Sequence, residues 1–203
     1  MVTLNPATTA LLAVHLQHDI VSPGTAFGQM FHPEVQSRDV LTQCRKAMQS
    51  LRDAGGLVVP LRIAFMDNYS DLNRALPLLQ MVAQAGCLKE ASEGSAIVAE
   101  VDVHDSDEVV IHQLPGPFSG SKLQEILASR GVENVVICGV ATNASVEAAV
   151  RQAADLGYGT YVLSDATSAA DNDSHQASLA SMGLFAQVIT LEEFTAALPS
   201  HVA

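Results

Sequence analysis

Two kinds of segment alternate along the chain. Short runs made almost entirely of β-branched and aliphatic residues are followed by longer stretches in which apolar residues recur every three to four positions. Strands that are covered on both faces read as continuous apolar runs, so the alternation predicts parallel βαβ units in an α/β protein. The six expected strands, in a mostly parallel sheet, cover residues 10–16, 57–65, 108–112, 134–139, 159–164 and 186–190.

The longest periodic stretch predicts a helix over residues 33–54. Its apolar side chains form one stripe, and Pro33 stands in the expected first turn, where a missing N–H costs little. Gly55 and Gly56 follow it, and glycine is the usual residue after the end of a helix. We expect this helix to pack on the sheet.

Two further helices are expected. The helix over 142–156 begins directly after the fourth expected strand, with Thr142 as candidate N-cap and Gly157 as its end. The pattern is weaker over 72–83, where a helix is expected with an interruption at Pro77.

The composition is that of one compact domain. The chain has 203 residues, of which 48% are hydrophobic and 16% charged, enough apolar surface to form a core. No repeat, low-complexity tract or linker divides it, and a single core of this size is common. We therefore predict a single domain over residues 1–203.

Charge and cysteine content narrow the expected partners and location. The formal net charge of −12 leaves no basic stripe that could bind a phosphate backbone, so nucleic acid is not an expected partner. Cys44, Cys87 and Cys138 are widely spaced within or beside apolar segments and are expected to be buried free thiols. No apolar stretch approaches the roughly 20 residues of a membrane span, and no basic leader precedes the first apolar run. These features predict a soluble cytoplasmic protein.

Three polar residues stand where the site of a parallel sheet is expected. In an open parallel sheet the ligand crevice lies beyond the carboxyl ends of the strands, where the strand order reverses. His15 lies near the end of the first expected strand, His112 ends the third, and Ser145 lies in the first turn of the helix after the fourth. A histidine can act as base or acid near neutral pH, or it can be a hydrogen-bonded core residue, and this pattern leaves both open.

Ser145 also has two interpretations. Free backbone N–H groups at a helix start favour negative charge and can stabilise an oxyanion beside a nucleophile. The alternative is that Asn143 and Ser145 only satisfy the N–H groups of the helix end. No phosphate loop accompanies the site, because the glycines around Lys122 lack the required spacing.

Three segments, in this order, resemble the isochorismatase-like hydrolase superfamily. Residues 15–20 are similar to its Asp-Met-Gln-Asn-Asp-Phe run, 118–123 to Phe-x-Gly-Thr-x-Leu, and 139–147 to Gly-Val-Ala-Thr-Asn-Val-Cys-Val-Glu. The resemblance covers nearly the whole chain. The positions of the family's catalytic Asp, Lys and Cys are occupied by His15, His112 and Ser145.

The resemblance implies a three-layer αβα sandwich around a Rossmann-like sheet, assembled as a homodimer or homotetramer. It also implies a cis peptide between Val140 and Ala141 and an oxyanion hole formed by the backbone N–H groups of Ala141 and Ser145. Nicotinamidases of this superfamily bind a metal through histidines after the second strand, but this chain has no histidine between His32 and His104. We therefore expect neither a metal nor another cofactor.

Two functions follow as hypotheses. The first is a hydrolase of a small-molecule amide, carbamoyl, ester or vinyl ether substrate, with His15, His112 and Ser145 as catalytic residues and Phe118 and Asn143 lining the substrate pocket. The second is a catalytically inactive member that acts as a small-molecule-binding or assembly module, since all three reactive groups have changed. The aromatic residues Phe27, Phe31 and Phe65 either line the pocket or pack in the core.

Overall fold

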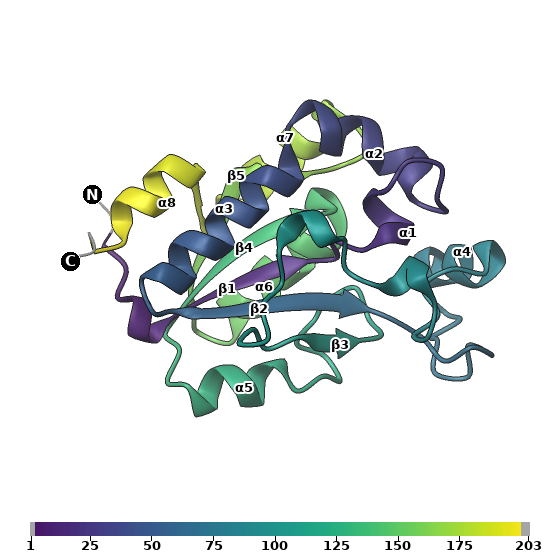
Figure 1. Cartoon of the computed structure of the whole chain (residues 1–203), viewed down its shortest axis with the longest axis horizontal. Helices are drawn as coiled ribbons and strands as arrows, with labels where there is room; N and C mark the ends of the chain where they lie inside the picture. Colours follow the sequence, from purple (N-terminus) through teal and green to yellow (C-terminus); the bar gives the residue numbers. More distant parts are fainter. Residues whose placement is uncertain (1–2, 200–203) are drawn as a thin grey trace.

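A computed structural model describes residues 3–199 as one six-stranded sheet with helices on both faces (Figure 1). All strand pairs are parallel, in the order β3-β2-β1-β4-β5-β6. The strands are β1 (Thr9–Val14), β2 (Leu57–Ile63), β3 (Val110–His112), β4 (Asn134–Val140), β5 (Gly159–Ser168) and β6 (Gln187–Ile189). The α-helices are α1 (His18–Val21), α2 (Gly28–Ser37), α3 (Val40–Asp53), α4 (Pro77–Ala85), α5 (Leu123–Ser129), α6 (Glu147–Asp155), α7 (Asn172–Met182) and α8 (Leu191–Ala197).

The central strands explain the continuous apolar runs of the sequence. Every residue of β1 is buried, because its side chains point alternately into two separate cores. Leu11 packs in the core beneath α3 and α8, whereas Leu12 packs in the core beneath α5, α6 and α7. The predicted α/β architecture is therefore confirmed as three layers, with all strands parallel.

The helix expected over 33–54 is wrong in its extent. The structure has two helices here, because Asp39 adopts a left-handed conformation (φ 53°) between α2 and α3. Aspartate tolerates this conformation better than most residues, so it can end a helix without glycine. Consequently Pro33 lies inside α2 and not in a first turn.

The segment after β4 also differs from the expected helix start. Thr142–Val146 forms a single π-helical turn before α6 begins at Glu147, and Thr142 does not cap it with its side chain. In the weaker region, Pro77 does not interrupt a helix but begins α4, where its missing N–H is harmless. The three cysteines are buried free thiols, as predicted.

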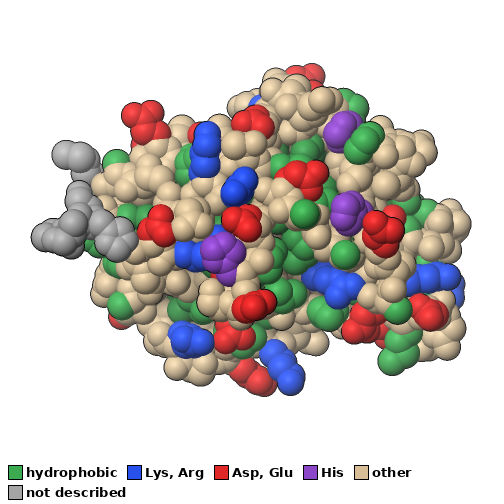
Figure 2. All heavy atoms as spheres, viewed as in Figure 1, with side chains coloured by type: hydrophobic (Ala, Val, Ile, Leu, Met, Phe, Trp, Pro, Cys, Tyr) green, Lys and Arg blue, Asp and Glu red, His purple; other side chains and the backbone are tan. Residues whose placement is uncertain are grey.

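The surface is mixed in character. Figure 2 shows acidic, basic and hydrophobic side chains interspersed over one face, without a continuous basic area. Within residues 3–199, no helix is both long enough and apolar enough to span a membrane.

Candidate active site

The site lies at the carboxyl ends of β1 and β4. The chain adds strands on one side of β1 and then returns to place β4 on its other side, so these two strands form the switch point of the sheet. Val14 pairs with Gly139 at their ends. His15 directly follows β1 and Ser145 lies in the π-helical turn after β4, so residues 130 positions apart meet at one edge.

A glycine allows the two strand ends to approach closely. Gly139 has a φ of +112°, and a Cβ built there would lie 2.1 Å from the carbonyl oxygen of Val14. No residue with a side chain fits this contact. The next peptide bond, Val140–Ala141, is cis, where the resemblance implies it.

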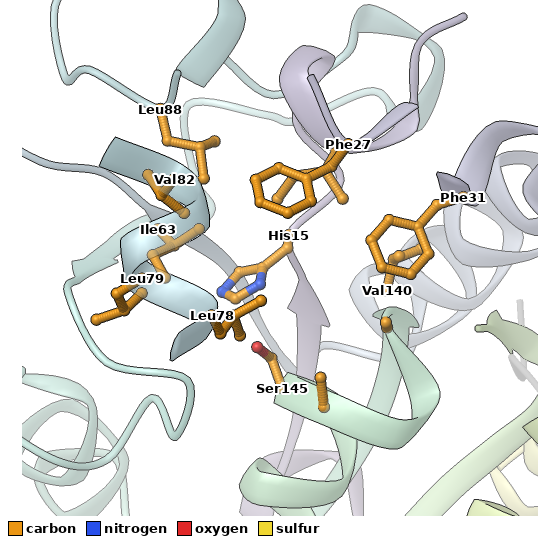
Figure 3. A pocket seen from close by; sticks show the side chains of 13 residues that line it. His15, Phe27, Phe31, Ile63, Leu78, Leu79, Val82, Leu88, Val140 and Ser145 are labelled. Carbon is orange, nitrogen blue, oxygen red and sulfur yellow. The ribbon is translucent and has the colours of Figure 1, made fainter. Parts of the chain in front are cut away.

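Between α2 and α4, the strand ends form the floor of a narrow pocket (Figure 3). The cavity has a volume of about 60 Å³, and among its lining residues only His15 and Ser145 have polar side chains. Phe31 of α2 and Phe27, the residue before α2, both line it, so two of the three aromatic residues left open by the sequence belong to the pocket. The remaining lining residues are Ile20, Ile63, Leu78, Leu79, Val82, Leu88, Val140, Ala141 and Ala144.

His112 lies behind His15 and fixes its ring. The Nδ1 of His112 is 2.8 Å from the carbonyl oxygen of Leu114 and must carry a hydrogen, because a carbonyl only accepts. The Nε2 of neutral His112 therefore accepts a hydrogen bond from the Nε2 of His15, 3.0 Å away. This leaves Nδ1 of His15 unprotonated, in a ring that lines the pocket.

Both imidazoles are neutral at physiological pH. Burial lowers the pKa of His112 from 6.5 to about 4, although its hydrogen bond to Leu114 opposes the shift. Burial, and then the charge that His112 would carry, lowers the pKa of His15 well below 6.5. With no other titratable side chain lining it, the pocket carries no charge near pH 7.

His15 and Ser145 face the same cavity without bonding to each other. Figure 3 shows the imidazole and the hydroxyl on facing walls of the pocket, and their side chains are 4% and 5% exposed in the order His15, Ser145. Among the described residues no hydrogen bond joins them. His15 has a left-handed backbone (φ 52°), an uncommon conformation that sets the direction of its side chain.

Not every expected pocket residue lies there. Phe118 packs against Tyr158 in the core beneath α5 and α6, with ring centroids 6.0 Å apart, and does not line the pocket. Asn143 is exposed and also does not line it, and Phe65 is fully buried in the other core. Instead α4 supplies Leu78, Leu79 and Val82, which sequence reasoning missed because an apolar helix face does not reveal what it covers.

The described residues contain no metal-binding cluster. Within 3–199, no group of three or more His, Cys, Asp or Glu side chains is placed to hold an ion. His15 and His112 use their facing nitrogens for the hydrogen bond between them.

Fold and site define a doubly wound α/β protein with its candidate site at the switch point. The sequence model of the Isochorismatase domain matches residues 9–193. YwoC of Bacillus subtilis (strain 168), described as an uncharacterized isochorismatase family protein, is 32% identical over 171 residues, which are 84% of this chain and 83% of YwoC. YecD of Escherichia coli O157:H7, with the same description, is 30% identical over 184 residues, covering 88% and 89% of the two chains. The chain belongs to the isochorismatase family.

A solved structure agrees with this assignment at the level of the fold. The cysteine hydrolase from Pseudomonas syringae pv. phaseolicola 1448A superposes with a TM-score of 0.88 at 24% identity, covering 98% of this chain and 95% of that chain. Both the sheet and its helical layers are therefore shared over nearly the full length.

Proposed function

We propose that this chain is a hydrolase of small, uncharged acyl compounds in which Ser145 is the nucleophile and His15 its general base. The observation that carries the proposal is the hydrogen bond from His15 to His112, because it keeps Nδ1 of His15 free in a pocket that also holds the Ser145 hydroxyl. His112 thus supplies the orienting partner that a histidine base needs.

The reaction would proceed through an acyl-enzyme. Ser145 Oγ bonds to the acyl carbon while its proton passes to Nδ1 of His15, and the leaving alcohol or amine then takes that proton as its bond to the acyl carbon breaks. Water attacks the acyl group in the second half and returns the proton to Ser145 through His15. The backbone N–H groups of Ala141 and Ser145 are the proposed donors to the oxyanion.

The low pKa of His15 has two consequences for the chemistry. Its basic form is complete at neutral pH, but a base of low pKa accepts a proton weakly, so we expect slow turnover and a preference for good leaving groups. Cleavage of a vinyl ether by proton donation is the least supported reaction, because at neutral pH His15 is a neutral imidazole and not the imidazolium that could act as the acid.

The pocket walls favour an apolar acyl group. All lining side chains except His15 and Ser145 are apolar, and none is charged, so an anionic substrate would lose its hydration without gaining a counter-charge. We therefore expect small esters with short acyl chains to react before amides or carboxylate-bearing compounds.

The second candidate function is a small-molecule-binding module without catalysis. It is favoured by the absence, among the described residues, of a hydrogen bond between Ser145 and His15. In this function the same apolar pocket binds a ligand that is never cleaved.

The test is covalent labelling with a fluorophosphonate, followed by peptide mass spectrometry, together with hydrolysis of p-nitrophenyl acetate and of small amides. We expect label on Ser145, no label on Ser145→Ala, and unchanged labelling of Ser37→Ala, which alters an exposed serine outside the pocket. Activity that survives Ser145→Ala would refute the nucleophile. No turnover combined with saturable binding of a small apolar ester would favour the binding module.

A further inference from the structure

A third buried histidine lies outside the pocket and contacts the segment that carries Ser145. His175 on α7 is fully buried, and its two ring nitrogens contact different elements. Nε2 lies 2.7 Å from Nη2 of Arg38, the residue after α2, and Nδ1 lies 2.8 Å from Oγ1 of Thr142. None of these three residues lines the pocket.

The protonation of this chain of contacts is fixed by Arg38. A guanidinium only donates, so Nε2 of His175 accepts and Nδ1 carries the hydrogen that is donated to Thr142. Burial and the positive charge of Arg38 lower the pKa of His175 to about 4, so it remains in this one tautomer at neutral pH.

Arg38 is itself anchored to the sheet. Its Nη2 donates to the carbonyl of Ser164 at 3.0 Å and its Nε donates to that of Thr167 at 3.3 Å, both in β5. Within residues 3–199 no carboxylate lies within ion-pair distance of Arg38. The guanidinium therefore joins β5 to His175 instead of neutralising an acid.

Thr142 connects this chain of contacts to the candidate nucleophile. It opens the π-helical turn whose fourth residue is Ser145. Ser178 of α7 also contacts this segment: its Oγ lies 2.6 Å from Oε2 of Glu147, the charged acceptor for its single hydrogen, and 3.0 Å from the Thr142 carbonyl oxygen. We infer that His175, in the tautomer that Arg38 sets, is a positioning residue, which fixes the turn through Thr142 so that the Ser145 hydroxyl faces the pocket. The effect on catalysis rests on the proposed function, whereas the fixing of the turn can be measured without any turnover.

Two substitutions of His175 separate its two hydrogen bonds. In His175→Asn the amide nitrogen takes the place of Nδ1 and can still donate to Thr142. In His175→Gln the amide oxygen takes the place of Nε2 and can accept from Arg38, but Thr142 loses its donor. Gln176→Ala, at the exposed neighbouring position on α7, is the matched control.

Amide hydrogen exchange over residues 142–147 and the rate of fluorophosphonate labelling are then compared. For His175→Gln we expect exchange in the turn to accelerate about tenfold or more and labelling to slow roughly 10- to 100-fold. His175→Asn should stay close to wild type in both, as should the control. Unchanged exchange in β1 would show that the fold is intact.

The outcomes distinguish this inference from the proposed function. If His175→Gln and His175→Asn behave alike, the hydrogen bond to Thr142 does not position the turn and the inference is overturned. If wild type is never labelled, the proposed hydrolase fails, but the exchange rates still decide the inference. Should His175→Gln fail to fold, Thr142→Val against Thr142→Ser provides the same comparison from the acceptor side.

Discussion

The buried imidazole of His112 makes the stability of the fold depend on pH in a defined window. Its pKa is about 4 in the folded protein and 6.5 in the unfolded chain, because burial disfavours the charged form. The unfolded state therefore binds this proton at higher pH than the folded state, and acid favours unfolding. The contribution is constant above pH 6.5 and is lost as the pH falls toward 4.

The size of the effect follows from the two pKa values. Linkage gives a loss from this one group of about 2 kcal/mol between pH 7.5 and 5, which is a large part of the stability of an ordinary domain. The lowered pKa values of His15 and His175 act with the same sign, so the whole protein should lose more than this.

The contribution of His112 can be isolated with His112→Asn. The asparagine amide can replace Nδ1–H as donor to the Leu114 carbonyl, and it does not titrate. The chain has no tryptophan, so urea unfolding is best followed by far-ultraviolet circular dichroism at about pH 7.5 and about pH 5. We expect wild type to lose roughly 2 kcal/mol more than the variant over this interval. Equal losses in the two proteins would refute the assignment of a buried, neutral His112.

Two further predictions concern stability alone and use urea unfolding with matched controls. Gly139→Ala should cost at least about 2 kcal/mol, since its Cβ would overlap the carbonyl of Val14, whereas Gly157→Ala, also at positive φ but with open space, should cost about 1 kcal/mol. Similar costs for the two would contradict the close approach of β1 and β4. Asp107→Ala should cost about 3 kcal/mol because it leaves a guanidinium buried without its partner, and Glu108→Ala, from an exposed pair, should cost less than about 1 kcal/mol. Equal, small effects would show that burial does not distinguish the two ion pairs.

The sheet could be predicted because its signal is local. Each strand lies between two helical layers and therefore reads as an apolar run, whatever its neighbours are. The break at Asp39 could not be predicted, because a left-handed aspartate has no pattern of its own and the apolar stripe continues across it. The π-helical turn before Glu147 was missed for a related reason: Thr142 has the chemistry of an N-cap, but its hydroxyl is taken by His175 from a distant helix.

The site was predictable to the extent that it follows from strand ends. His15 directly follows β1, His112 is the last residue of β3, and Ser145 lies in the turn after β4. Parallel strands bring their carboxyl ends to one edge of the sheet. The residues of the pocket walls, in contrast, are set by tertiary packing. Leu78 and Leu79 belong to a helix in the long connection after β2, and no sequence period indicates which strand ends that helix will cover.

The changes at positions 15 and 112 are coupled physically, and this bears on whether the site is active. The resemblance places an acid and a base there, a pair with no net charge, and this chain has two neutral imidazoles joined at 3.0 Å. Changing only one member would leave a charge buried without its partner, at a cost of about 3–5 kcal/mol. In the histidine pair, His15 donates a hydrogen bond and His112 accepts it, while His112 is held by the Leu114 carbonyl. The free nitrogen belongs to His15, whose ring lines the pocket. To avoid a buried unpaired charge, it is enough that the acid and the base at positions 15 and 112 are both replaced by uncharged residues. Any well-packed pair of apolar residues would do this. Two hydrogen-bonded imidazoles beside a serine are not needed to keep the site uncharged, but they do provide a base next to a hydroxyl. For this reason the hydrolase is the first hypothesis to test and the binding module the second.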